Sequence, residues 1–98
     1  MRVFVSSPGA AIGPQIPAYA EFRMFAALAR YPAVQGARVE LRQDAERKVR
    51  CSVTVDVNGS APARAHASGP QASVTIDRAA EQVIRLMRQR FQPDTVGA

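Results

Sequence analysis

The stretch of sequence that decides the fold is residues 37–59, ARVELRQDAERKVRCSVTVDVNG. Apolar and polar side chains alternate there at every second position, on both sides of a polar link at residues 43–48. Because successive side chains of a strand point to opposite faces of a sheet, this period of two predicts two antiparallel strands with one apolar face. Asn58-Gly59 closes the stretch, and this dipeptide favours the tight turn into a further hairpin.

Two shorter runs with the same period predict further strands. Arg2–Ser6 (RVFVS) places two valines on one face. Arg64–Ser68 alternates two alanines with polar residues and predicts a fourth strand.

A first helix is predicted at Pro17–Arg30. Ile16-Pro17 opens it, because proline at the first helical position loses no hydrogen bond, and Tyr31-Pro32 ends it. Its core stripe is expected to consist of side chains at helical spacing, namely Ala18, Phe22, Phe25, Leu28 and Ala29.

A second helix is predicted from Ala72 to Phe91, with Arg78 and Arg85 opposite its apolar face. The centre of that face consists of Ile76, Ala80, Val83, Met87 and Phe91. The order is then β-α-β-β-β-α, which predicts an α+β fold with a four-stranded sheet and both helices packed on one face. We expect a single domain over residues 1–92 and a flexible tail at 93–98.

The net charge of +5 and a pI of about 10.7 favour a polyanionic partner, because basic side chains release counterions from phosphates. All but one of the 13 basic residues are arginine. A GC-rich genome also produces such a bias, so the charge alone leaves nucleic-acid binding and genomic composition as alternatives.

Residues that could carry catalysis are few. His66 is the one histidine and has no ligand-type residue at a suitable spacing, so it is interpreted as a solvated strand residue. Cys51 lies on the apolar side of its strand and is interpreted as a small core side chain, not as a reactive thiol. We therefore predict no catalytic residue, no metal site, no cofactor and no small-molecule substrate.

The N-terminus lacks the pattern of a signal peptide, and the apolar stretches are short and broken by proline and glycine. This predicts no membrane association and a reducing cytoplasm. The oligomeric state is left open.

The arginines carry most of the functional information, since guanidinium groups bind phosphate in a bidentate way and stack on bases. Arg38, Arg42 and Arg50 are expected on the exposed sheet face, with Arg64. The alternative interpretation is a solvated surface with local salt bridges. The other groups are Arg23 with Arg30, Arg47 with Lys48, and Arg78 with Arg85 and Arg88.

Two segments resemble a known family. Val39-Glu40-Leu41 leads to Arg47-Lys48-Val49-Arg50-Cys51 in the central hairpin, and Thr75-Ile76-Asp77-Arg78-Ala79-Ala80-Glu81 opens the last helix. Relatives have a similar strand and helix start, and a first helix that ends like Leu28-Ala29-Arg30-Tyr31. Over residues 19–90 the chain resembles the short ribosome hibernation-promoting factors, also called ribosome-associated inhibitors or sigma-factor modulation proteins.

The resemblance implies a fold like that of double-stranded-RNA-binding domains and a non-catalytic translation inhibitor that acts under stress. Its partner would be the small ribosomal subunit, whose rRNA it would bind in the decoding channel, so that tRNA and mRNA are blocked. The lysine-rich tail of strong ribosome binders has no counterpart here, because residues 92–98 hold no basic residue. Carried over by position, the rRNA contacts are Arg23, Arg30, Arg47, Lys48, Arg78, Arg85 and Arg88.

A second hypothesis is a protein-interaction module of the same fold without ribosome binding, using the exposed edge of the fourth strand. An enzyme is a third, which a deep pocket lined by polar residues would indicate.

Overall fold

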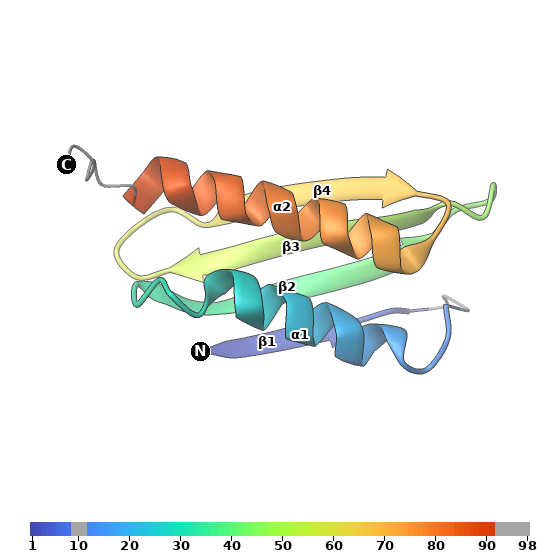
Figure 1. Ribbon diagram of the computed structural model, residues 1–98, viewed down its shortest axis with the longest axis horizontal. Coiled ribbons are helices and arrows are strands. Elements are labelled where there is room, and N and C mark those ends of the chain that lie inside the picture. Colours follow the sequence, from blue (N-terminus) through green and yellow to red (C-terminus); the bar gives the residue numbers. More distant parts are fainter. Residues whose placement is uncertain (9–11, 92–98) are drawn as a thin grey trace.

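The computed structural model describes residues 1–8 and 12–91, so the predicted tail at 93–98 lies outside the described residues. The predicted order β-α-β-β-β-α is confirmed (Figure 1). The elements are β1 (Arg2–Ser6), α1 (Ile16–Leu28), β2 (Val34–Gln43), β3 (Val49–Val57), β4 (Ala63–Gly69) and α2 (Ala72–Phe91).

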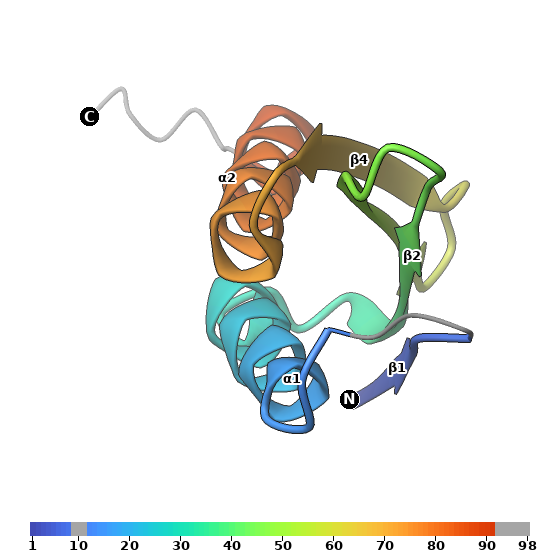
Figure 2. The same ribbon diagram turned by 90° about the vertical axis from the view of Figure 1, so that its right-hand side faces the viewer.

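The four strands lie in the order β1-β2-β3-β4, and β2, β3 and β4 pair antiparallel as expected. β1 instead runs parallel to β2, which makes the sheet mixed. The reason is the connection: α1 crosses over between the two strands, and a crossover of this kind returns the chain in the same direction. Both helices cover one face of the sheet, α1 beside β1 and β2 and α2 beside β3 and β4 (Figures 1 and 2).

The core lies between this face and the helices. The inward side chains of the central strands are almost fully buried, and α2 meets them with the apolar face that its sequence predicts. Each large side chain buried in this way contributes roughly 1.5–3 kcal/mol to folding. The largest of them are Met24, Leu28, Leu41, Ile76 and Met87.

The predicted core stripe of α1 is wrong apart from Leu28. Phe22 is 66% exposed and Phe25 is 49% exposed, and the alanines that were expected beside them, Ala18 and Ala29, are exposed as well. The buried side chains are Ala20, Met24, Ala27 and Leu28. The helix carries apolar residues on nearly every side, so their spacing selects no face, and packing against the sheet and α2 decides the orientation instead.

β4 forms one edge of the sheet, and side chains of α2 hydrogen-bond to its outer backbone groups. The N–H of His66 donates to Oε1 of Gln82 at 3.3 Å. Arg78 donates to the carbonyl oxygen of Ser68 at 3.5 Å, and Arg90 donates to the carbonyl oxygen of Ala61, just before the strand. The edge that an interaction module was expected to use is thus already hydrogen-bonded by α2.

Within the described ranges, neither helix is long and apolar enough to cross a membrane.

Candidate nucleic-acid interface

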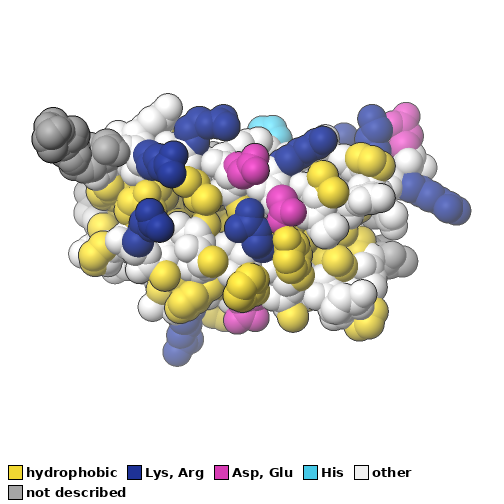
Figure 3. Space-filling view, viewed as in Figure 1, with side chains coloured by type: hydrophobic (Ala, Val, Ile, Leu, Met, Phe, Trp, Pro, Cys, Tyr) yellow, Lys and Arg dark blue, Asp and Glu magenta, His cyan; other side chains and the backbone are white. Residues whose placement is uncertain are grey.

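The outward face of α2 brings three of the expected contact residues together. Arg78, Arg85 and Arg88 are all exposed, and Arg78 and Arg88 are ten positions apart, about 15 Å along the helix at 1.5 Å per residue. They lie there because the opposite side of α2 is apolar and buried, which leaves the charged side to solvent. Figure 3 shows Lys and Arg side chains spread over α2, with hydrophobic side chains along α1.

Arg30, in the turn after α1, joins this group. It lines a small hollow of about 90 Å³ together with Arg88, and Ala27, Tyr31 and Ile84 form part of its walls. The ring of Tyr31 lies 5.9 Å from that of Phe91, a contact that holds the ends of the two helices together there. We call the surface formed by Arg30, Arg78, Arg85 and Arg88 the α2 surface.

Arg64 was assigned to the sheet group by its place in the sequence, but it also borders α2. It lines a hollow of about 260 Å³ with Arg85 and Gln82. Because β4 is an edge strand, a long side chain on it can reach around to the neighbouring helix. No sequence pattern gave this proximity, since it depends on α2 lying over β4.

Among the residues that the structure describes, none of the four arginines of the α2 surface forms an ion pair with a carboxylate. Glu81 and Asp77 are the acidic residues of α2, and Asp77 is paired with Arg23 of α1. The α2 surface therefore has an excess of positive charge.

Arg47 and Lys48 lie in the β2–β3 hairpin, at the end of the molecule where α2 begins (Figure 1). Asp44 builds the turn: its Oδ1 accepts hydrogen bonds from the N–H of Glu46 at 2.9 Å and of Lys48 at 3.0 Å. Arg47 adopts a positive φ of 66° at the tip. The turn thus presents two exposed basic side chains next to each other.

Arg23 is placed differently from the other expected contacts. Its Nε lies 2.9 Å from Oδ1 of Asp77 at the start of α2, and the Tyr19 hydroxyl donates to the same oxygen. The Arg23 side chain is 25% exposed. Its charge is therefore opposed by a carboxylate, and the group joins α1 to α2.

The pKa values in this cluster follow from these contacts. The hydrogen bond from Tyr19, followed by that from Arg23, lowers the pKa of Asp77. The same hydrogen bond to Asp77 raises the pKa of Tyr19, because it is lost when the phenol ionises. The cluster is thus most stable with an ionised carboxylate and a neutral phenol.

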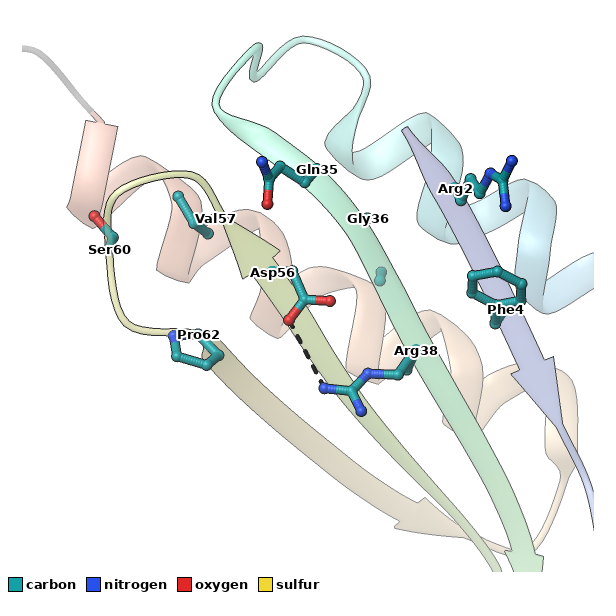
Figure 4. Close-up of a pocket in the computed structure, with 10 residues that line it drawn as sticks. Arg2, Phe4, Gln35, Gly36, Arg38, Asp56, Val57, Ser60 and Pro62 are labelled. Atoms are coloured by element: carbon teal, nitrogen blue, oxygen red, sulfur yellow. Dashed lines mark ion pairs between the residues drawn. The ribbon is translucent and has the colours of Figure 1, made fainter.

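The face of the sheet that no helix covers, here called the open sheet face, also carries expected arginines, and three of these have an acidic partner, whereas Arg64 has none among the described residues. Arg38 lies 3.7 Å from Asp56, Arg42 lies 3.1 Å from Glu40, and Arg50 lies 3.7 Å from Asp44. Figure 4 shows Arg38 and Asp56 pointing toward each other across β2 and β3, beside a hollow of about 410 Å³ that Phe4 also lines. The salt-bridge interpretation therefore describes these three arginines.

Both residues with reactive side chains are placed as the sequence predicts. His66 is exposed on the open sheet face. Cys51 is fully buried, and this burial raises the pKa of its thiol to about 12. No three His, Cys, Asp or Glu side chains within residues 1–8 and 12–91 gather as metal ligands would.

The family described as sigma 54 modulation protein / S30EA ribosomal protein matches residues 3–91, from β1 to the end of α2. The chain belongs to this family. The resemblance predicted from the hairpin and helix motifs is thereby confirmed, and the chain is a member of a group of ribosome-associated modulation and hibernation factors that are generally non-enzymatic.

Two solved structures have the same fold. A ribosomal subunit interface protein from Coxiella burnetii superposes with a TM-score of 0.82 at 14% identity, over 94% of this chain and 99% of the other. The N-terminal domain of Protein Y from Thermus thermophilus has a TM-score of 0.64 at 25% identity, over 88% of this chain and 99% of the other. Among curated proteins, the comparison finds no significant match.

Proposed function

We propose that this member of the family inhibits translation by binding the rRNA of the small ribosomal subunit in the decoding channel. It acts in the cytoplasm under stress, by steric exclusion of mRNA and tRNA, without a cofactor and without catalysis. The observation that carries the proposal is the α2 surface: on a chain of a ribosome-associated family, its arginines have no carboxylate partner among the described residues.

The chemistry of such a surface suits folded RNA. A guanidinium group offers donors in a planar fork that matches two phosphate oxygens, and it retains its charge at any physiological pH. Double-stranded RNA is bound mainly through its backbone and shape, so a convex row of arginines needs no base-reading pocket. Arg78, Arg85 and Arg88 supply that row on a rigid helix, and Arg30 extends it.

Arg47 and Lys48 supply a second point of contact at the hairpin, away from the C-terminal half of α2 (Figure 1). Two separate contact points fix the orientation of the protein on its target better than one. Arg23 contributes least to the RNA contact, because Asp77 opposes its charge, and its main role is to position α1 against α2.

The test is co-sedimentation with purified small ribosomal subunits over a series of salt concentrations, with mRNA and tRNA as competitors. Each phosphate contact that is lost should reduce the slope of log affinity against log salt by about one unit. Arg85→Ala should therefore lower the affinity for small subunits and reduce this slope. Arg42→Ala removes the same side chain from the open sheet face and should change neither quantity.

Binding that competing mRNA and tRNA displace supports the decoding channel. Binding that they leave unchanged places the site elsewhere on the subunit, and an Arg85→Ala variant with an unaltered salt slope excludes the α2 surface.

A further inference from the structure

The two edge strands of the sheet differ in their hydrogen bonding. The outer backbone of β4 is bonded by side chains of α2, whereas the outer edge of β1 has no backbone hydrogen bond to any of the described residues. An edge strand with free N–H and C=O groups is a template for pairing with another chain. β1 also lacks the proline or bulge that commonly blocks such an edge, and its one charged side chain, Arg2, lies at its first position.

The close contact between Arg2 and Gly36 shows which residues of β1 direct their free N–H and C=O groups outward. A Cβ atom on Gly36 of β2 would lie only 2.7 Å from the carbonyl oxygen of Arg2, so the backbone of Arg2 faces β2. Because consecutive residues of a strand direct their backbone groups to opposite sides, Val3 and Val5 direct theirs away from the sheet.

Apolar side chains surround this free edge. Phe4 on β1 is 59% exposed on the open sheet face. On the helix side, Met1 is 42% exposed and lines a groove of about 300 Å³ with Phe25, Pro32 and Leu28. A free strand edge between two apolar surfaces is a surface suited to another protein strand.

The sequence of β1 fits a second copy of itself. If two β1 strands pair antiparallel about a twofold axis at Phe4, Val3 lies opposite Val5 of the second copy, and both residues have outward backbone groups. Arg2 lies opposite Ser6 of the second copy, so the arginines do not face each other. The two Phe4 rings meet across the axis, where side chains of a pair without direct hydrogen bonds approach most closely.

We propose that the chain forms a twofold dimer by antiparallel pairing of β1 with β1 of a second copy, which joins the two sheets into one. The proposal is independent of the proposed function, because Arg78, Arg85 and Arg88 lie on α2, which packs over β3 and β4 and remains free in the dimer (Figure 2).

Sedimentation equilibrium of the purified chain over a range of concentrations provides the first test. Phe4→Lys places two like charges opposite each other and should raise the dimer dissociation constant by about tenfold or more. Val74→Lys adds the same charge at an exposed valine on α2 and should leave the dissociation constant unchanged. Circular dichroism establishes that both variants remain folded.

Disulfide trapping tests the register directly. Phe4→Cys brings two thiols together across the axis, at a Cβ separation of about 4.5–5.5 Å that a disulfide can bridge with a small adjustment. Ser6→Cys places its two thiols about 14 Å apart along the strands, at 3.4 Å per residue, and should not crosslink alone. Mixed Arg2→Cys and Ser6→Cys chains should crosslink, and the native Cys51 is fully buried and does not interfere.

Crosslinking of Phe4→Cys and of the mixed pair, without crosslinking of Ser6→Cys alone, supports the dimer. A wild-type chain that sediments as a monomer at every concentration overturns it, and so does equal crosslinking of all three. If Phe4→Lys does not fold, the cysteine variants decide. Arg85→Ala should lose RNA binding and keep the dimer, because the two proposals use different surfaces.

Discussion

Two surfaces of this molecule carry exposed arginines, and they differ in what lies beside each guanidinium group. On the open sheet face, Arg38, Arg42 and Arg50 each lie within 3.1–3.7 Å of a carboxylate. On the α2 surface, no arginine has a carboxylate partner among the described residues. On the sheet, Arg38 meets Asp56 across β2 and β3, and Arg42 meets Glu40 two positions along β2. On α2, Glu81 is exposed on the same helix, but among the described residues it forms no ion pair with these arginines.

The difference shows that the number of arginines is a poor guide to the binding surface. An ion pair at an exposed site contributes little to stability, but it must be broken or shared before the arginine can contact a phosphate. Arginines that form no ion pair with a carboxylate avoid that cost. The α2 surface is therefore the better candidate, although the open sheet face has a similar number of guanidinium groups.

The largest expected effect separates the two surfaces with matched triple variants. Replacing Arg78, Arg85 and Arg88 by alanine should lower affinity for small subunits by more than about a hundredfold and reduce the salt slope by about three units. Replacing Arg38, Arg42 and Arg50 by alanine removes the same charge from the sheet and should lower affinity far less. Co-sedimentation at several salt concentrations measures both, and equal losses would mean that net charge alone determines binding.

The strands and α2 were predicted well from the sequence because the pattern of each is compatible with only one buried face. A period of two over β2 and β3 assigns each side chain to a face, and in α2 the charged and apolar residues occupy opposite sides. The same patterns placed Arg78, Arg85 and Arg88 on the outside, and the hairpin motif placed Arg47 and Lys48 at an exposed turn.

The buried face of α1 was predicted wrongly because apolar residues on several sides of this helix could each form a core stripe. Ala20, Met24 and Ala27 form as good a stripe as Phe22 and Phe25, and only the contacts with the sheet and α2 distinguish them. The partner of Arg23 was missed for the same reason. Asp77 lies 54 positions further along the chain, and their contact depends on how the two helices pack.

The second largest effect concerns the ion pair between Arg23 and Asp77. Like the sheet arginines, Arg23 has an acidic partner. Asp77→Asn keeps the size of the side chain but weakens its hydrogen bonds with Tyr19 and Arg23. Because the site is partly exposed, the free energy of unfolding should fall by only about 0.5–1 kcal/mol. Urea denaturation measures it, with Glu81→Gln as a control that removes one charge elsewhere on α2. An equal loss in both variants would show that the cluster contributes nothing specific.

The pH dependence of the difference in unfolding free energy between wild type and Asp77→Asn is a further test. Folding lowers the pKa of Asp77, so the native state binds this proton less tightly than the unfolded chain. The stabilisation is then complete above the ordinary aspartate pKa of about 3.9 and is lost as the pH falls through the lower native value. Wild type and Asp77→Asn should differ in unfolding free energy at pH 6, begin to converge below about pH 4 and meet only below the lowered native pKa of Asp77. A constant difference over this range would assign the effect to packing.

The smallest effect should come from removing acids on the open sheet face. Glu40→Gln with Asp56→Asn leaves Arg42 and Arg38 without their partners and makes the sheet resemble the α2 surface. Affinity for small subunits should rise about threefold or less, since exposed ion pairs are weak and this face is not the proposed contact. The gain should disappear at high salt, because it comes from added net charge alone. A large gain that mRNA and tRNA displace would instead show that the open sheet face can occupy the channel, and the comparison between the two surfaces would then fail.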